Sequence, residues 1–207
     1  MVVISSPLSR RVVNSISQLV TDFQKYPERY WNERDIHWSL FYYLKHTQVC
    51  TEAYPTQLIR SELPTLKVFN GKRPARGHYD LAILDSHTPN LTEVLGRQNQ
   101  ISWDEFLKAI KIDAAIEIKM WQSRQRQVRI EELIGWDIKK LTDEPNNINN
   151  AYFLNFVQLD FANKHMKDYY HKLREYLGNQ KNKWPDLNIL CVPNDLQIQP
   201  GLKDNWL

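Results

Sequence analysis

Strand-like and helix-like segments alternate through the second half of this chain, and no other feature constrains the fold as strongly. Three strand-like runs lie at residues 114–121, 150–157 and 187–192. Apolar residues at three- and four-residue steps fill the two intervals between them, at 130–141 and 164–177. We expect the second of these helices to stop at Gly178. Strands that alternate with helices predict an α/β or α+β fold, with a mixed sheet of four to five strands flanked by helices.

The first half of the chain predicts two helices followed by two strands. The first helix follows Ser6-Pro7 and ends before Pro27, and the second begins near Asn32. Strand-like runs follow, and then an insertion that holds one short helix with a capping box, Ser102-Trp-Asp-Glu105. The two strands are expected at 49–59 and 78–84, and the insertion at about 86–112. We expect one domain over residues 1–207.

Composition excludes several classes of protein. Of the 207 residues, 42% are hydrophobic, which is typical of a globular domain and not of a disordered or fibrous chain. No apolar run is long enough to cross a membrane, and the first residues do not resemble a secretion signal. Cys50 and Cys191 do not form a CxxC pair. We therefore expect a cytoplasmic protein without a membrane partner.

The net charge of +3 is too small to indicate a nucleic-acid partner, but its distribution is uneven. Two segments carry basic residues and no acidic ones. These segments could follow a phosphate backbone, or they could be solvated loops. The candidate nucleic-acid-binding residues are Lys72, Arg73, Arg76, Arg124, Arg126 and Arg129.

Two strand-like runs carry acidic residues that could converge. Asp80 lies in the first, and Glu117 and Lys119 share one face of the second. Two carboxylates with an adjacent ammonium suit Mg²⁺ or Mn²⁺ and the hydrolysis of a phosphate ester. The alternative is a solvated strand face, because the triplet alone is not distinctive: the sequence holds a second acid-x-Lys triplet, Asp137-Ile-Lys139. The second triplet lies in a helical stretch, where its two charges point apart, and only the first lies in a strand.

These residues resemble the motif of the PD-(D/E)xK, or restriction-endonuclease-like, nuclease superfamily. The resemblance rests on Asp80, on Glu117-Ile118-Lys119 in an apolar strand, and on a preceding helix that bears Glu33. It covers the order helix–strand–strand–strand–helix–strand from about residue 32 to 157. Tyr79 stands where the superfamily name has proline, and the insertion lengthens the separation between Asp80 and Glu117.

The resemblance implies a restriction-endonuclease-like fold and a role for each matching residue. Asp80, Glu117, the backbone carbonyl of Ile118 and the helix-borne acid Glu33 would bind Mg²⁺ or Mn²⁺, and Lys119 would assist the attacking water. The expected activity is metal-dependent hydrolysis of DNA phosphodiester bonds, by an endonuclease that acts alone or as a homodimer.

Two alternatives to an enzyme remain open. The first is a catalytically silent nucleic-acid-binding or assembly module with the same fold. The second is a protein-interaction subunit that uses its aromatic helices. A chelator distinguishes an active metal site from a silent one, and salt distinguishes phosphate binding from an apolar protein interface.

Overall fold

The structure is a computed structural model that describes residues 7–46, 58–69, 75–122, 130–143, 146–160, 162, 164–194 and 205–207. Within these ranges no helix is long and apolar enough to cross a membrane. The fold is α/β, with a five-stranded mixed sheet between helices.

The sheet order follows the chain order, β1-β2-β3-β4-β5. The pairs β1–β2 and β2–β3 are antiparallel, whereas the pairs β3–β4 and β4–β5 are parallel and are joined by helices. The strands are β1 (Ile59–Phe69), β2 (Ala75–Leu84), β3 (Ile112–Gln122), β4 (Ile148–Gln158) and β5 (Leu187–Pro193). The helices are α1 (Pro7–Lys25), η1 (Pro27–Arg29), α2 (Glu33–His46), α3 (Leu91–Gly96), α4 (Trp103–Ala109), α5 (Ile130–Thr142) and α6 (Lys164–Lys183).

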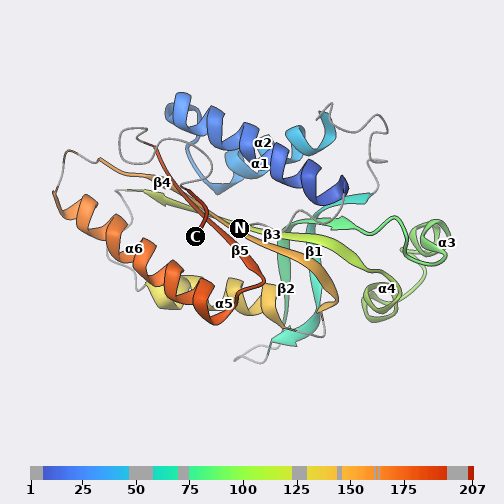
Figure 1. Cartoon of the computed structure of the whole chain (residues 1–207). Helices are drawn as coiled ribbons and strands as arrows, with labels where there is room; N and C mark the ends of the chain where they lie inside the picture. Colours follow the sequence, from blue (N-terminus) through green and yellow to red (C-terminus); the bar gives the residue numbers. More distant parts are fainter. Residues whose placement is uncertain are drawn as a thin grey trace.

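Helices cover both faces of the sheet and create two hydrophobic cores. Figure 1 shows α1 and α2 on one face and α5 and α6 on the other, with α3 and α4 at one end. Alternation along β3 divides its side chains between the cores, as the sequence predicts. Ile116, Ile118 and Met120 pack toward α1 and α2, whereas Ala115 and Trp121 pack toward α5 and α6. Glu117 and Lys119 therefore belong to the α5 face of the strand.

The predicted order of helices and strands is confirmed, and two of its details are wrong. The described first strand begins only at Ile59, where the predicted one ends, and residues 47–57 lie outside the described residues. β1 accommodates Pro64 because it is an edge strand. The insertion holds two helices and not one, although its predicted capping box at Ser102 is present. α6 continues through Gly178, because one glycine weakens a helix without ending it.

The predicted faces of β2 also need correction. Strict alternation along the strand predicts that Tyr79 shares a face with Leu81 and Ile83. Instead Tyr79 packs in the core beneath α5, while Leu81 and Ile83 pack toward α1 and α2. The alternation of β2 is thus interrupted beside Asp80, at the position where β2 leaves its neighbour β3.

Candidate active site

The candidate site begins where β2 and β3 separate. Their antiparallel register ends at the pair Leu81–Ile116, so the next positions, Asp80 and Glu117, flank the gap between the strands. The ladder bond that Ile118 would make with β2 is replaced, because its N–H donates to Asp80 Oδ2 at 2.6 Å. The carbonyl of a strand residue faces the same neighbour as its N–H, so the Ile118 carbonyl also faces this gap.

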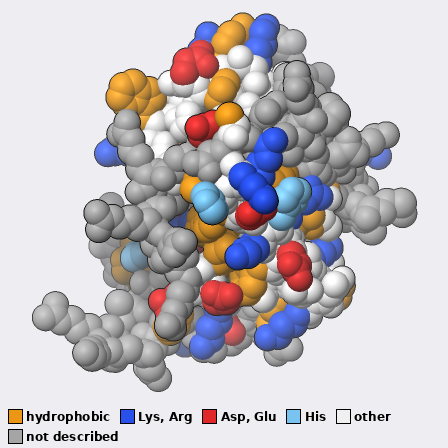
Figure 2. All heavy atoms as spheres, turned by 90° about the vertical axis from the view of Figure 1, so that its left-hand side faces the viewer, with side chains coloured by type: hydrophobic (Ala, Val, Ile, Leu, Met, Phe, Trp, Pro, Cys, Tyr) orange, Lys and Arg blue, Asp and Glu red, His pale blue; other side chains and the backbone are white. Residues whose placement is uncertain are grey.

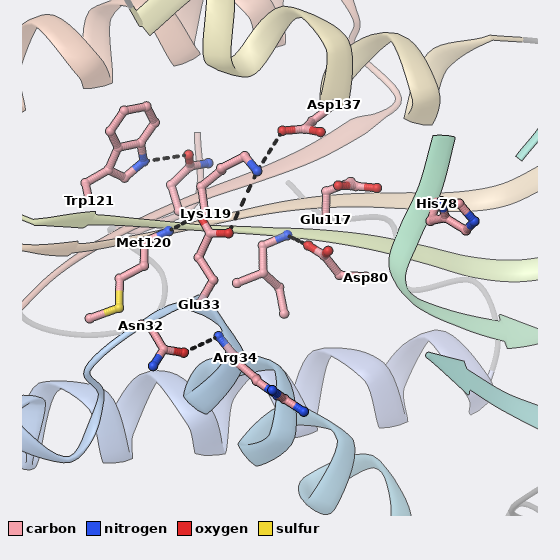
Figure 3. A network of polar contacts seen from close by, with 12 residues as sticks. Asn32, Glu33, Arg34, His78, Asp80, Glu117, Lys119, Met120, Trp121 and Asp137 are labelled. Atoms are coloured by element: carbon pink, nitrogen blue, oxygen red, sulfur yellow. Dashed lines mark hydrogen bonds and ion pairs between the residues drawn. The ribbon is translucent and has the colours of Figure 1, made fainter. Parts of the chain in front are cut away.

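Glu117 and Lys119 form ion pairs with α5. Lys119 Nζ lies 3.0 Å from Asp137 Oδ2, and Figure 3 shows both side chains directed toward each other between β3 and α5. Lys140 Nζ lies 2.8 Å from Glu117 Oε2 and 2.9 Å from Asp137 Oδ1. It also donates to the His78 carbonyl at 2.9 Å. Two lysines thus connect β3 to one helical turn of α5.

Glu33 approaches the site from the first turn of α2. The helix starts there because Asn32 Oδ1 accepts the N–H of Arg34 at 2.8 Å, while Asp35 Oδ2 accepts the N–H of Trp31 and of Asn32. Glu33 Oε1 accepts from the N–H of Met120 at 3.3 Å, and its other oxygen lies 4.0 Å from Lys119 Nζ. Glu33 and Asp80 line the same pocket. All four residues of the predicted constellation are therefore close together.

Burial governs the protonation of these groups. The Glu117 side chain is 1% exposed, and burial, together with the nearby Asp80 carboxylate, raises its pKa well above the usual value. Burial also raises the pKa of Asp80, against the opposing effects of the Ile118 N–H and the two lysines. For Lys119 and Lys140 burial opposes the charge, but the neighbouring carboxylates outweigh it and raise both pKa values.

The protein ligands that a divalent cation would find here are two carboxylates and one backbone carbonyl. Within the described ranges, no group of three or more His, Cys, Asp or Glu side chains is arranged to hold a metal ion. Mg²⁺ commonly needs only one or two carboxylates and keeps several waters. Glu117 Oε1 is buried without a hydrogen-bond partner among the described residues, so it has a free lone pair. Asp80, Glu117 and the Ile118 carbonyl could supply the protein ligands.

The charge balance supports the same fit. When ionised, Glu33, Asp80, Glu117 and Asp137 carry two more charges than Lys119 and Lys140 neutralise. One divalent cation would remove this excess.

Three residues of the site were missed by sequence reasoning. The triplet that contains Asp137 served as an argument against the motif, yet Asp137 and Lys140 are three residues apart and lie on the same face of α5. A signal was available, since Asp137 falls among the buried residues Ile134 and Ile138. His37 was also missed. Its Nε2 lies 2.9 Å from the Asp80 carbonyl oxygen, and nothing in the local sequence links the two.

The described part of the structure includes none of the predicted nucleic-acid-binding side chains. Lys72, Arg73, Arg124, Arg126 and Arg129 lie outside the described residues. For Arg76 only the backbone is described, as part of β2 opposite Val68. On the face shown in Figure 2, basic, acidic and histidine side chains are interspersed and do not form a field of one sign.

Comparisons with protein-family models, with curated proteins and with solved structures found no significant match. The functional interpretation therefore depends on the chemistry of the site.

Proposed function

We propose that this protein is a metal-dependent nuclease with a restriction-endonuclease-like core, which hydrolyses phosphodiester bonds in DNA. The observation that supports this most strongly is the convergence of Asp80 and Glu117 where β2 and β3 separate, with Lys119 beside them. The order α2, β1, β2, β3, α5, β4 is the one that the sequence resemblance implies.

Each residue has a distinct task in this proposal. Asp80, Glu117 and the Ile118 carbonyl bind the cation, and Glu33 holds the backbone of β3 beside it. Bound there, Mg²⁺ or Mn²⁺ would lower the pKa of a water molecule and neutralise charge on the phosphate. Lys119 donates to the attacking water or to a phosphate oxygen, and Asp137 holds its ammonium in place at 3.0 Å.

The decisive experiment is a cleavage assay on supercoiled plasmid and on end-labelled single strands, with Mg²⁺, Mn²⁺ or EDTA. Lys119→Ala should reduce the cleavage rate at least about a hundredfold, as expected when a donor to the transition state is removed. The matched control is Lys139→Ala, which removes an exposed lysine from the second acid-x-Lys triplet. Equal activity of the folded Lys119→Ala variant and the wild type would refute the proposal.

Metal binding offers a readout that does not depend on turnover. Asp80→Asn keeps the shape of the side chain but removes one anionic ligand, so calorimetry should show weaker Mn²⁺ binding than in the wild type. Asp104→Asn changes an exposed carboxylate in α4 and should leave the affinity unchanged. Unchanged Mn²⁺ affinity in Asp80→Asn would contradict the assigned ligand.

One observation favours a catalytically silent nucleic-acid-binding module as the second candidate. The ammonium of Lys140 already contacts Glu117 at 2.8 Å, and that of Lys119 contacts Asp137 at 3.0 Å, so the lysines stabilise these acids without a metal. A silent module would bind DNA equally in Mg²⁺ and in EDTA and would not cut it.

A further inference from the structure

The exposed face of α2 presents aromatic side chains beside the candidate site. Trp38 is 51% exposed and Tyr42 is 58% exposed, and their spacing of four residues places them on one side of the helix. Single exposed aromatic residues are common on protein surfaces, whereas neighbouring ones indicate a contact surface. This pair is continuous with the site, because Trp38 lines the pocket that also contains Asp80.

The Trp38 ring is held in position relative to Asp80. It packs at 78° to the ring of His37 and at 84° to that of Phe41, with centroids 5.6 and 5.8 Å away. His37 is itself fixed, since its Nε2 lies 2.9 Å from the Asp80 carbonyl oxygen and 3.1 Å from Ser61 Oγ. A ligand bound at Asp80 would therefore lie beside an indole ring whose orientation is fixed.

The charge of the pocket favours a neutral group beside this indole. The pocket has a volume of about 410 Å³, and the described residues of its lining include the three acids Glu33, Glu62 and Asp80 and one cation, Arg34. One cation bound at Asp80 can accept one phosphate, but a second phosphate would meet the remaining carboxylates. A nucleobase is uncharged, and its face can stack on an aromatic side chain.

We propose that Trp38 stacks an unpaired base of the substrate, so that the preferred substrate is single-stranded DNA or the single-stranded part of a branched molecule. The inference rests on the proposed function, because the phosphate must lie at Asp80 for the next base to reach Trp38. Bases within a duplex are already stacked on each other, and only unpaired bases expose their faces to a side chain.

The test distinguishes contacts with the base from contacts with the phosphate backbone. Fluorescence anisotropy with Ca²⁺ in place of Mg²⁺, so that a cation still neutralises the carboxylates, compares oligothymidylate with an abasic oligomer of the same length and charge. The wild type should bind oligothymidylate more tightly. Trp38→Ala should lose about tenfold in affinity for oligothymidylate, in line with one lost stacking contact, and none for the abasic oligomer.

Two further variants keep the test specific. Trp38→Phe retains an aromatic face and should recover most of the affinity. Trp103→Ala removes another exposed tryptophan, which lies in α4, and should bind both oligomers as the wild type does. If Trp38→Ala and the wild type distinguish the two oligomers equally well, the inference is wrong.

The outcomes also separate this inference from the proposed nuclease activity. Lys119-dependent cleavage together with no effect of Trp38→Ala would overturn the inference and leave the nuclease standing. A Trp38-dependent preference for oligothymidylate without metal-dependent cleavage would support base stacking and overturn the nuclease. An aromatic surface that serves a protein partner would bind neither oligomer, and that result would overturn the inference.

Discussion

Replacement of Lys140 by methionine should destabilise the protein in a pH-dependent manner. The variant keeps most of the apolar stem but removes the ammonium that contacts Glu117 Oε2 at 2.8 Å. At an effective dielectric constant of about 20, two unit charges at this distance attract with about 6 kcal/mol, which is an upper limit for this one pair. Removal of one partner from a buried ion pair typically costs about 3–5 kcal/mol. We expect a loss in this range at pH 8.

The sign of the pH dependence follows from Glu117. Burial raises its pKa in the folded state above the unfolded value, so the native protein retains a proton that the unfolded chain releases. The unfolding free energy therefore falls as pH rises from the unfolded pKa toward the folded one. Without the Lys140 ammonium, which lowers the pKa of Glu117, this fall extends to higher pH. The deficit of Lys140→Met should be smallest near pH 5 and largest near pH 8.

Urea denaturation in EDTA at pH 5, 6.5 and 8 measures this difference, with Lys139→Met as the control. Lys139 is the exposed neighbour in the same helix, and its substitution should change stability by less than about 0.5 kcal/mol at every pH. Addition of Glu117→Gln to Lys140→Met should restore stability at pH 8, because the amide cannot carry a charge. Equal deficits of Lys140→Met at pH 5 and pH 8 would refute the reasoning, because the contribution of Lys140 would then not depend on the ionisation of Glu117.

Three further predictions concern other parts of the fold. Tyr30→Phe removes the hydroxyl that donates to Asp22 Oδ2 at 2.7 Å and should lower the unfolding free energy by about 1–2 kcal/mol in urea titrations; an unchanged midpoint would contradict this. Burial raises the pKa of Cys191 to about 12, so alkylation followed by mass spectrometry should find it unmodified at pH 8 until urea unfolds the chain. Ser102→Ala breaks the capping box with Glu105 and should cost about 1 kcal/mol, whereas a loss near zero would show that α4 does not need its cap.

The sequence predicts elements well where one pattern dominates. β3 and β4 were found because burial favours apolar residues along most of β3 and from Tyr152 to Val157 in β4. The end of α6 was not found, because Gly178 only weakens the helix and the chain supplies no competing turn before Pro185. The pairing of β1 with β2 joins residues across a segment outside the described ranges, and local periodicity carries no information about such a partner.

The residues of the candidate site also differ in how well the sequence predicts them. Asp80, Glu117 and Lys119 could be identified because each lies in a strand-like run of the sequence and because together they resemble a known motif. For Asp137 and Lys140 the helical spacing predicts only a shared face of α5 with the apolar residues Ile134 and Ile138. It does not predict which strand that face meets, because this depends on how Ile134, Ile138 and Leu141 pack in the core.

This arrangement of buried acids lowers the free energy of unfolding below what a core built only for stability would reach. Asp80, Glu117 and Asp137 are acids held against one another where two strands separate, and apolar residues of similar volume would often stabilise a core as well or better. Local rules are broken here in several ways at once, by the interrupted alternation of β2, by the carboxylate that replaces a ladder bond, and by a buried acid on the apolar face of α5. Such departures gather at functional sites, where charge and geometry serve a ligand. A divalent cation bound at the proposed site would relieve the repulsion among these acids.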